Sequence, residues 1–252
     1  MDEIIRLQCK IGELKNKRAE SIIQSMDENA VPISINMIVD NNFNLSIKKK
    51  DERGLFHKKI IEDETWPTIF ENYMRDYFKV LKPSAIIIGF KTASLLNDKF
   101  FINVNRTIII LINDKKQANF MDHRNDIKGK YDIVLNHDEL YDKLLEKGFI
   151  KKDEDKEFEQ KPIILAGGEK NYRDFIELYL NHFKPPTYQK ASKPFKIKEI
   201  MIYEINEDGK CNNTIPEING FCDNRNEFWS KYELNHIFNF ESTIWKRTLS
   251  FK

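Results

Sequence analysis

Short, unbroken apolar runs constrain the fold of this chain more than any other feature. Three of them, Ala85–Phe90, Thr107–Ile112 and Ile163–Ala166, have the length of a single strand. A run without polar alternation is typical of a strand that is covered on both faces. Residues with helical spacing follow these runs, and strand and helix alternate along the chain. The pattern predicts an α/β fold with a mainly parallel sheet and helices on both faces, a Rossmann-like three-layer arrangement.

The predicted elements cover most of the chain. The strands are Val31–Val39, Ser84–Phe90, Thr107–Asn113, Tyr131–Leu135, the run that ends at Ala166, and Ile197–Ile205. The helices are Thr65–Leu81, Lys91–Asn97, Asp138–Lys147, the segment after Gly168, and Glu227–Phe238. Loops or turns are predicted for Asp40–Arg53, Asn113–Lys130 and Glu207–Gly220.

An amphipathic helix is predicted near the N-terminus, because Ile4, Leu7 and Ile11 recur at three- and four-residue spacings among charged neighbours. This helix, within residues 1–29, could pair with a second copy to form a homo-oligomer. An α/β core is predicted over residues 30–150. The charged run at 151–161 is a candidate boundary, and residues 162–252 continue the same domain or form a smaller second α/β subdomain.

Composition narrows the compartment and the partners. Three cysteines, with no leading apolar signal, predict a reducing, cytoplasmic location. The longest apolar runs are too short to cross a bilayer, so no membrane partner is expected. A formal net charge of +1 gives no global attraction to nucleic acid. Abundant Asn, Lys and Ile with 9 Gly indicate an AT-rich genome, as in many phages, viruses and low-GC bacteria.

The paired glycines at the end of one apolar run are the leading candidate for a ligand site. Gly167 and Gly168 stand between a predicted strand and a helix, and Lys170 and Asn171 follow them. Free backbone N–H groups and the helix dipole at such a turn attract phosphate. The pattern is neither G-x-G-x-x-G nor a P-loop, and Glu169 would repel an anion. The alternative is a turn that needs glycine only for its backbone angles.

A second candidate lies in the predicted loop Asn113–Lys130, which follows a buried strand. Asp122 and His123 could act as an acid–base pair, and Lys115 and Arg124 could bind a ligand. The alternative is a solvated polar loop. His137-Asp138-Glu139 has the same ambiguity, since Asn136 or Asp138 could cap the next helix.

Metal binding has little support in the sequence. Cys211 and Cys222 lack a paired Cys-x-x-Cys, and neither His-x-x-x-His nor His-Glu-x-x-His occurs. We therefore predict no metal, and no cofactor is identified. Two basic clusters, Lys48–Arg53 and Lys184–Lys198, are candidates for local contacts with nucleic acid, and solvated loops are the alternative.

The segment Leu81–Leu96 combines a Lys-Pro pair, an apolar run ending at Gly89, and a helix of small residues. This segment resembles a local pattern of the uracil-DNA glycosylase superfamily. The resemblance implies a glycosylase-like fold that acts on DNA, with Asp40 nearest to the water-activating position and Asn113–Arg124 facing DNA. Asp40-Asn41-Asn42 departs from the family's first motif, and Asn113-Asp114-Lys115 stands where a His-Pro pair is expected.

Three functions follow from these observations. The first is binding, with or without processing, of a phosphate-bearing small molecule such as a nucleotide at the carboxyl edge of the sheet. The second is a DNA- or RNA-acting protein with a glycosylase-like fold. The third is a non-enzymatic interaction or structural protein of viral or phage origin. These observations do not distinguish an enzyme from a binding protein.

Overall fold

A computed structural model describes residues 30–40, 84–96, 98–102, 106–151, 159–182, 195–205, 232–241 and 244–251. The predicted N-terminal helix, the loop after Asp40, the helix that begins at Thr65 and the turn-rich segment Glu207–Gly220 lie outside these residues. Most of the basic clusters Lys48–Arg53 and Lys184–Lys198 also lie outside them.

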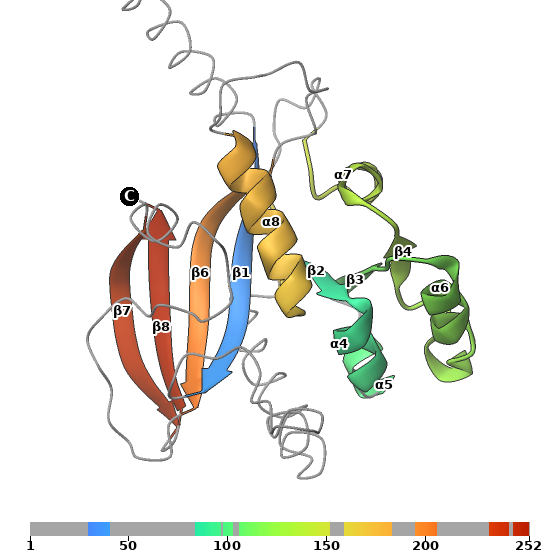
Figure 1. The fold of residues 1–252 in the computed structure, drawn as a ribbon, viewed down its shortest axis with the longest axis horizontal. Coiled ribbons are helices and arrows are strands. Elements are labelled where there is room, and N and C mark those ends of the chain that lie inside the picture. Colours follow the sequence, from blue (N-terminus) through green and yellow to red (C-terminus); the bar gives the residue numbers. More distant parts are fainter. Residues whose placement is uncertain are drawn as a thin grey trace, which may run out of the picture.

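One eight-stranded sheet organises the described residues (Figure 1). Its strands are β1 Val31–Asp40, β2 Ser84–Gly89, β3 Arg106–Leu111, β4 Asp132–Val134, β5 Ile163–Leu165, β6 Phe195–Ile205, β7 Tyr232–Glu241 and β8 Ile244–Phe251. Their order is β4-β3-β2-β5-β1-β6-β8-β7. Neighbouring strands from β4 to β6 pair in parallel, whereas β8 and β7 add an antiparallel ladder at one edge. The predicted α/β fold with a mostly parallel sheet is confirmed.

The described helices connect the parallel strands. They are α4 Phe90–Leu95, α5 Asp98–Phe101, α6 Lys115–Asp122, the 3-10 turn η1 Asn125–Ile127, α7 His137–Glu146 and α8 Glu169–His182. The predicted helix Asp138–Lys147 is confirmed to within one residue at each end. Asn136 caps α7, its side chain accepting a hydrogen bond from the Glu139 N–H at 2.8 Å, and Gly148 follows the helix with a φ of 71°.

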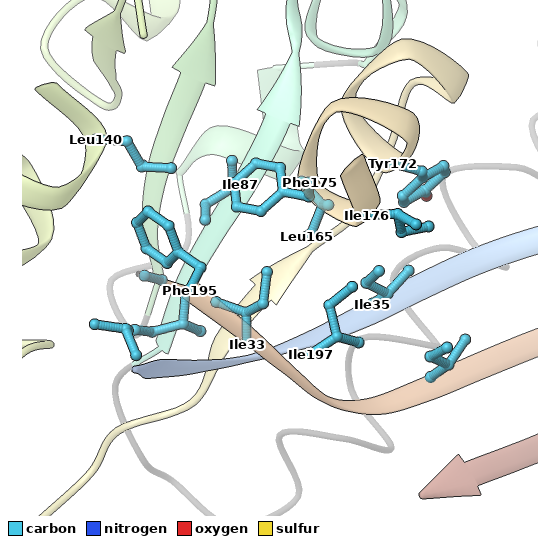
Figure 2. Close-up of a cluster of buried hydrophobic side chains, with 14 of the residues drawn as sticks. Ile33, Ile35, Ile87, Leu140, Leu165, Tyr172, Phe175, Ile176, Phe195 and Ile197 are labelled. Carbon is cyan, nitrogen blue, oxygen red and sulfur yellow. The ribbon is translucent and has the colours of Figure 1, made fainter. Parts of the chain in front are cut away.

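Two buried apolar clusters occupy the two faces of the sheet. Within β2, Ile87 belongs to the first cluster, and its neighbours Ile86 and Ile88 belong to the second, as strand alternation requires. The first cluster includes residues of α7 and α8; Figure 2 shows Leu140 of α7 and Phe175 of α8 facing strand residues such as Ile87 and Leu165. The second cluster includes residues of α4, α5 and α6. Helices therefore cover opposite faces of the sheet.

The chain reverses its direction across the sheet between β4 and β5. From β2 it steps outward to β3 and β4 through α4, α5 and α6, on the face of the second cluster. It then returns through α7 to β5, which lies between β2 and β1, and continues through α8 to β6 on the other face. Adjacent β2 and β5 thus send their following helices to opposite faces. In open α/β sheets, ligands commonly bind near the carboxyl ends of the strands at such a topological switch point.

The predicted loop Asn113–Lys130 was wrong, because it contains α6 and η1. Asp114 begins α6 by accepting a hydrogen bond from the Gln117 N–H at 3.0 Å, and Met121 is fully buried beneath it. A capping aspartate followed by one buried face forms a short helix even where most side chains are polar.

The predicted helix Glu227–Phe238 was also wrong, because Tyr232–Glu241 forms β7. This segment pairs antiparallel with β8, a strand that was not predicted. Its sequence Tyr-Glu-Leu-Asn also alternates apolar and polar residues, so the local pattern fits either structure and the pairing partner decides between them. Likewise, the end of the basic cluster Lys184–Lys198 belongs to β6, which begins at Phe195.

Candidate functional site

The paired glycines lie where β5 ends and α8 begins, at the carboxyl edge of the sheet. Gly167 has a φ of 133° and Gly168 a φ of 88°. L-residues with a side chain rarely adopt these values, so both positions need glycine for their backbone conformation. The turn therefore needs glycine for its backbone angles, and the ligand role of Gly167 and Gly168 stays a prediction.

Glycine also permits the turns after β2 and β5 to approach each other closely. The hydrogen bonds between these strands continue past their ends, from Ala166 N–H to Ile87 O at 2.8 Å and from Gly89 N–H to Gly167 O at 3.2 Å. A Cβ at Gly167 would lie 2.8 Å from the Thr92 hydroxyl oxygen, and a Cβ at Gly89 would lie 2.5 Å from Asn171 Nδ2. The starts of α4 and α8 therefore meet directly over the ends of β2 and β5.

The first turn of α8 has backbone donors that lie outside the helical hydrogen-bond ladder. Tyr172 N–H bonds to Gly168 O at 3.1 Å, which is the first bond of the helical ladder. The N–H groups of residues 169–171 consequently have no acceptor within the helix, and they carry the positive end of its dipole. The Asn171 side-chain amide is committed locally, since it donates to Gly167 O at 3.1 Å.

Lys170 connects this turn with the end of β3. Its side chain is 67% exposed, and its ammonium group donates to Asn113 Oδ1 at 2.6 Å. The Asp174 carboxylate lies 4.0 Å from the same ammonium group. Asn113 follows β3 closely, so the contact joins residues 57 positions apart at one edge of the sheet. The structure thus brings Gly167, Gly168, Lys170 and Asn171 together, with Asn113 and Thr92 as neighbours that were not predicted as site residues.

Tyr172 fixes α8 against the sheet. Its buried hydroxyl donates to Asn36 O of β1 at 2.5 Å. Burial raises the pKa of the Tyr172 phenol far above its ordinary value, so the group stays protonated and keeps donating. The backbone donors at the start of α8 are therefore held in a fixed position relative to the strands.

Asp122 and His123 lie at the other end of α6. Asp122 is the last residue of the helix and His123 its C-cap, and both side chains are exposed. The His123 ring lies with Nδ1 2.5 Å from Asn119 O of the same helix. Because α6 begins just after β3, its C-terminal end points away from the carboxyl edge. The structure does not place this pair with the glycine turn.

Arg124 and Lys115 occupy different environments. The guanidinium group of Arg124 donates to Ala93 O and Leu96 O, each at 3.0 Å, and lies 5.2 Å from the centre of the Phe101 ring. These carbonyls belong to the C-terminal end of α4, where a cation also complements the helix dipole. Lys115 is exposed at the start of α6, two residues after Asn113, and so it lies on the carboxyl side of the sheet.

His137, the first residue of α7, borders the same edge. Its ring packs edge-on against Phe175 of α8, with 4.7 Å between the ring centres. Nε2 is buried and has no hydrogen-bond partner within the described part of the chain. Burial lowers the pKa of His137, while the Asp174 and Asp138 carboxylates oppose that shift more weakly.

Comparison with known proteins assigns no family: no family model matches the chain, and no curated protein matches it. Within the described ranges, no group of three or more His, Cys, Asp or Glu side chains could hold a metal ion. None of the helices in the same ranges combines the length and apolar character that a membrane span requires.

Proposed function

We propose that the protein binds a phosphate-bearing small molecule, such as a nucleotide, at the carboxyl edge of the sheet between β2 and β5. One observation carries the proposal: the glycine turn and Lys170 lie at the point where adjacent strands send their helices to opposite faces. In open α/β sheets, the carboxyl ends of the strands at a topological switch point are the usual place for a ligand.

The chemistry of the turn suits a phosphate group. The N–H groups of residues 169–171 supply donors that have no acceptor within the helix, and the 14-residue α8 supplies a dipole whose positive end lies here. Lys170 and the nearby Lys115 add positive charge. In this arrangement Lys170 exchanges its bond to Asn113 for a charge-assisted bond to phosphate, which is the stronger interaction.

Asp122, His123 and Arg124 have no part in the proposed binding site. The first two lie at the distal end of α6, and the donors of Arg124 serve the carbonyls of α4. The proposal is therefore one of binding, and it includes no chemical step.

Calorimetric titration with adenosine triphosphate and with inorganic triphosphate tests the proposal. We expect both to bind, and we expect Lys170→Met to weaken both at least tenfold, because a phosphate contact is lost. Lys130→Met is the matched control, since Lys130 is also exposed but lies just before β4, at the amino ends of the strands. Absence of binding by the unmodified protein at millimolar ligand would overturn the proposal.

Titration with a short single-stranded oligonucleotide distinguishes the proposed small-molecule site from the alternative, a DNA- or RNA-acting protein with a glycosylase-like fold. Tight, strongly salt-dependent binding of the oligonucleotide, with no binding of either triphosphate, would replace a small-molecule site by a nucleic-acid surface.

A further inference from the structure

An exposed aromatic side chain of α6 packs against Phe90, the residue that follows β2. Phe120 of α6 is 52% exposed, and its ring packs edge-to-face with Phe90 of α4, with centres 5.5 Å apart and planes at 84°. The other large hydrophobic side chains exposed among the described residues, Ile102 and Leu135, are aliphatic. Edge-to-face packing against a second ring restrains an aromatic side chain and leaves part of its apolar surface exposed.

Neighbouring contacts connect this ring pair to the glycine turn on two sides. Phe90 directly follows Gly89, whose backbone meets Asn171 at the start of α8. On the other side, Gln117 lies one helical turn before Phe120 and accepts a hydrogen bond from Asn113 N–H at 2.9 Å. Asn113 in turn receives the Lys170 ammonium group. Helical side chains lean toward the N-terminus of their helix, which directs Phe120 toward the carboxyl edge.

The charges around the ring pair favour an anionic ligand. Lys91 in the first turn of α4, together with Lys115 and Lys116 in the first turn of α6, is exposed on this side of the sheet. Asp114, the acidic residue among them, is engaged as the cap of α6. Aromatic surface with surrounding cations suits a ligand that combines a flat ring with phosphate.

We propose that Phe120, supported by Phe90, stacks against the base of a purine nucleotide whose phosphates bind at the start of α8. The inference rests on the proposed phosphate site and adds the chemical class of the ligand. A purine offers the larger ring surface for stacking, and stacking needs no hydrogen-bond partner on the base. Phe120 then determines specificity for the base, and the glycine turn binds the phosphates whichever base the nucleotide carries.

Titration of the full chain with adenosine triphosphate and with inorganic triphosphate tests the two proposals separately. We expect Phe120→Ala to weaken the nucleotide about tenfold and to leave triphosphate binding unchanged, because only the nucleotide carries a base. Phe120→Trp should retain or increase nucleotide affinity. Ile102→Ala is the matched control, since Ile102 is 53% exposed and precedes β3 at the amino edge of the sheet.

Each outcome decides between the proposals. Binding of both ligands with no effect of Phe120→Ala on either would overturn the stacking role and leave the phosphate site in place. Binding of neither ligand would overturn both. Thermal unfolding of each variant shows whether it is folded, and nuclear Overhauser contacts between the adenine protons and the Phe120 ring in the unmodified protein give a readout that does not depend on substitution.

Discussion

The two ends of α4 use polar and charged residues in opposite ways. At its N-terminal end, Gly89 and Thr92 meet Gly167 and Asn171, and the adjoining Lys170 stays largely exposed. At its C-terminal end, Arg124 donates to two backbone carbonyls and packs over an aromatic ring. Lys170, next to the first end, and Arg124, at the second, were both predicted from the sequence to bind a ligand. The contacts distinguish a cation whose donors complete the fold from a cation that remains accessible to a ligand.

The largest effect is expected at the N-terminal end, from Gly167→Ala. The substitution forces a side chain into a φ of 133° and places its Cβ 2.8 Å from the Thr92 hydroxyl. Strain and overpacking together should lower the free energy of unfolding by about 3 kcal/mol. Urea denaturation measures the loss.

Gly129→Ala separates the two causes, because Gly129 has a φ of 75° and open space around its Cβ position. Its cost should be about 1 kcal/mol, from backbone conformation alone. In the double variant Thr92→Ala/Gly167→Ala, part of the difference should be recovered. Equal losses of unfolding free energy for Gly167→Ala and Gly129→Ala would show that the close approach of the turns adds nothing to the cost of a side chain at Gly167.

Arg124→Met should produce the next largest effect, at the other end of α4. The variant removes the charged donor from Ala93 O and Leu96 O and retains most of the apolar length of the side chain. We expect a loss of about 2 kcal/mol in unfolding free energy. The exposed Lys128, four residues away, gives the matched control Lys128→Met, which should change stability by less than about 0.5 kcal/mol.

The affinity of Arg124→Met for adenosine triphosphate is the second measurement on this variant. The folded fraction of Arg124→Met should bind adenosine triphosphate as the unmodified protein does. A tenfold loss of affinity in this variant, at a temperature where it is fully folded, would move Arg124 into the ligand site and remove the contrast between the two ends.

The fold was predictable where burial on both faces leaves an unmistakable sequence pattern. The runs around Ile87 and Ile109 are apolar throughout, so their strands and parallel arrangement followed directly. The helix α6 was missed because one buried residue, Met121, and one capping residue define it among polar neighbours. The strand β7 was missed because its conformation depends on pairing with β8, which local spacing does not encode.

The site was predictable only in part, for a similar reason. Paired glycines after an apolar run indicate unusual backbone angles, and Gly167 and Gly168 have them. The proximity of Lys170 to Asn113, and of Gly167 to Thr92, depends on how β2, β3 and β5 are ordered in the sheet. Strand order results from long-range packing, and no short motif in this chain specifies it.

Lys170→Met should have little effect on stability and a large effect on binding, the reverse of Arg124→Met. An exposed lysine with one surface ion pair contributes less than about 0.5 kcal/mol to the free energy of unfolding. The same substitution should reduce the affinity for inorganic triphosphate at least tenfold, measured by calorimetry. A variant that is clearly destabilised, with unchanged affinity, would place Lys170 in the same structural class as Arg124.

The smallest expected effect concerns His137 and the pH dependence of stability. Because burial lowers the pKa of His137 in the folded protein, the unfolded chain binds more protons as the pH falls below about 6.5. Stability from this group is therefore fully present above that pH and declines as the pH falls toward the folded pKa. His137→Phe retains a ring against Phe175 and removes the titrating group. Urea denaturation should therefore show that the unfolding free energy of this variant falls less steeply than that of the unmodified protein between about pH 7.5 and about pH 5, a range around the ordinary histidine pKa of about 6.5. Identical slopes for His137→Phe and the unmodified protein would show that the carboxylates of Asp174 and Asp138 offset the burial of the ring, and that protonation at this edge does not oppose folding.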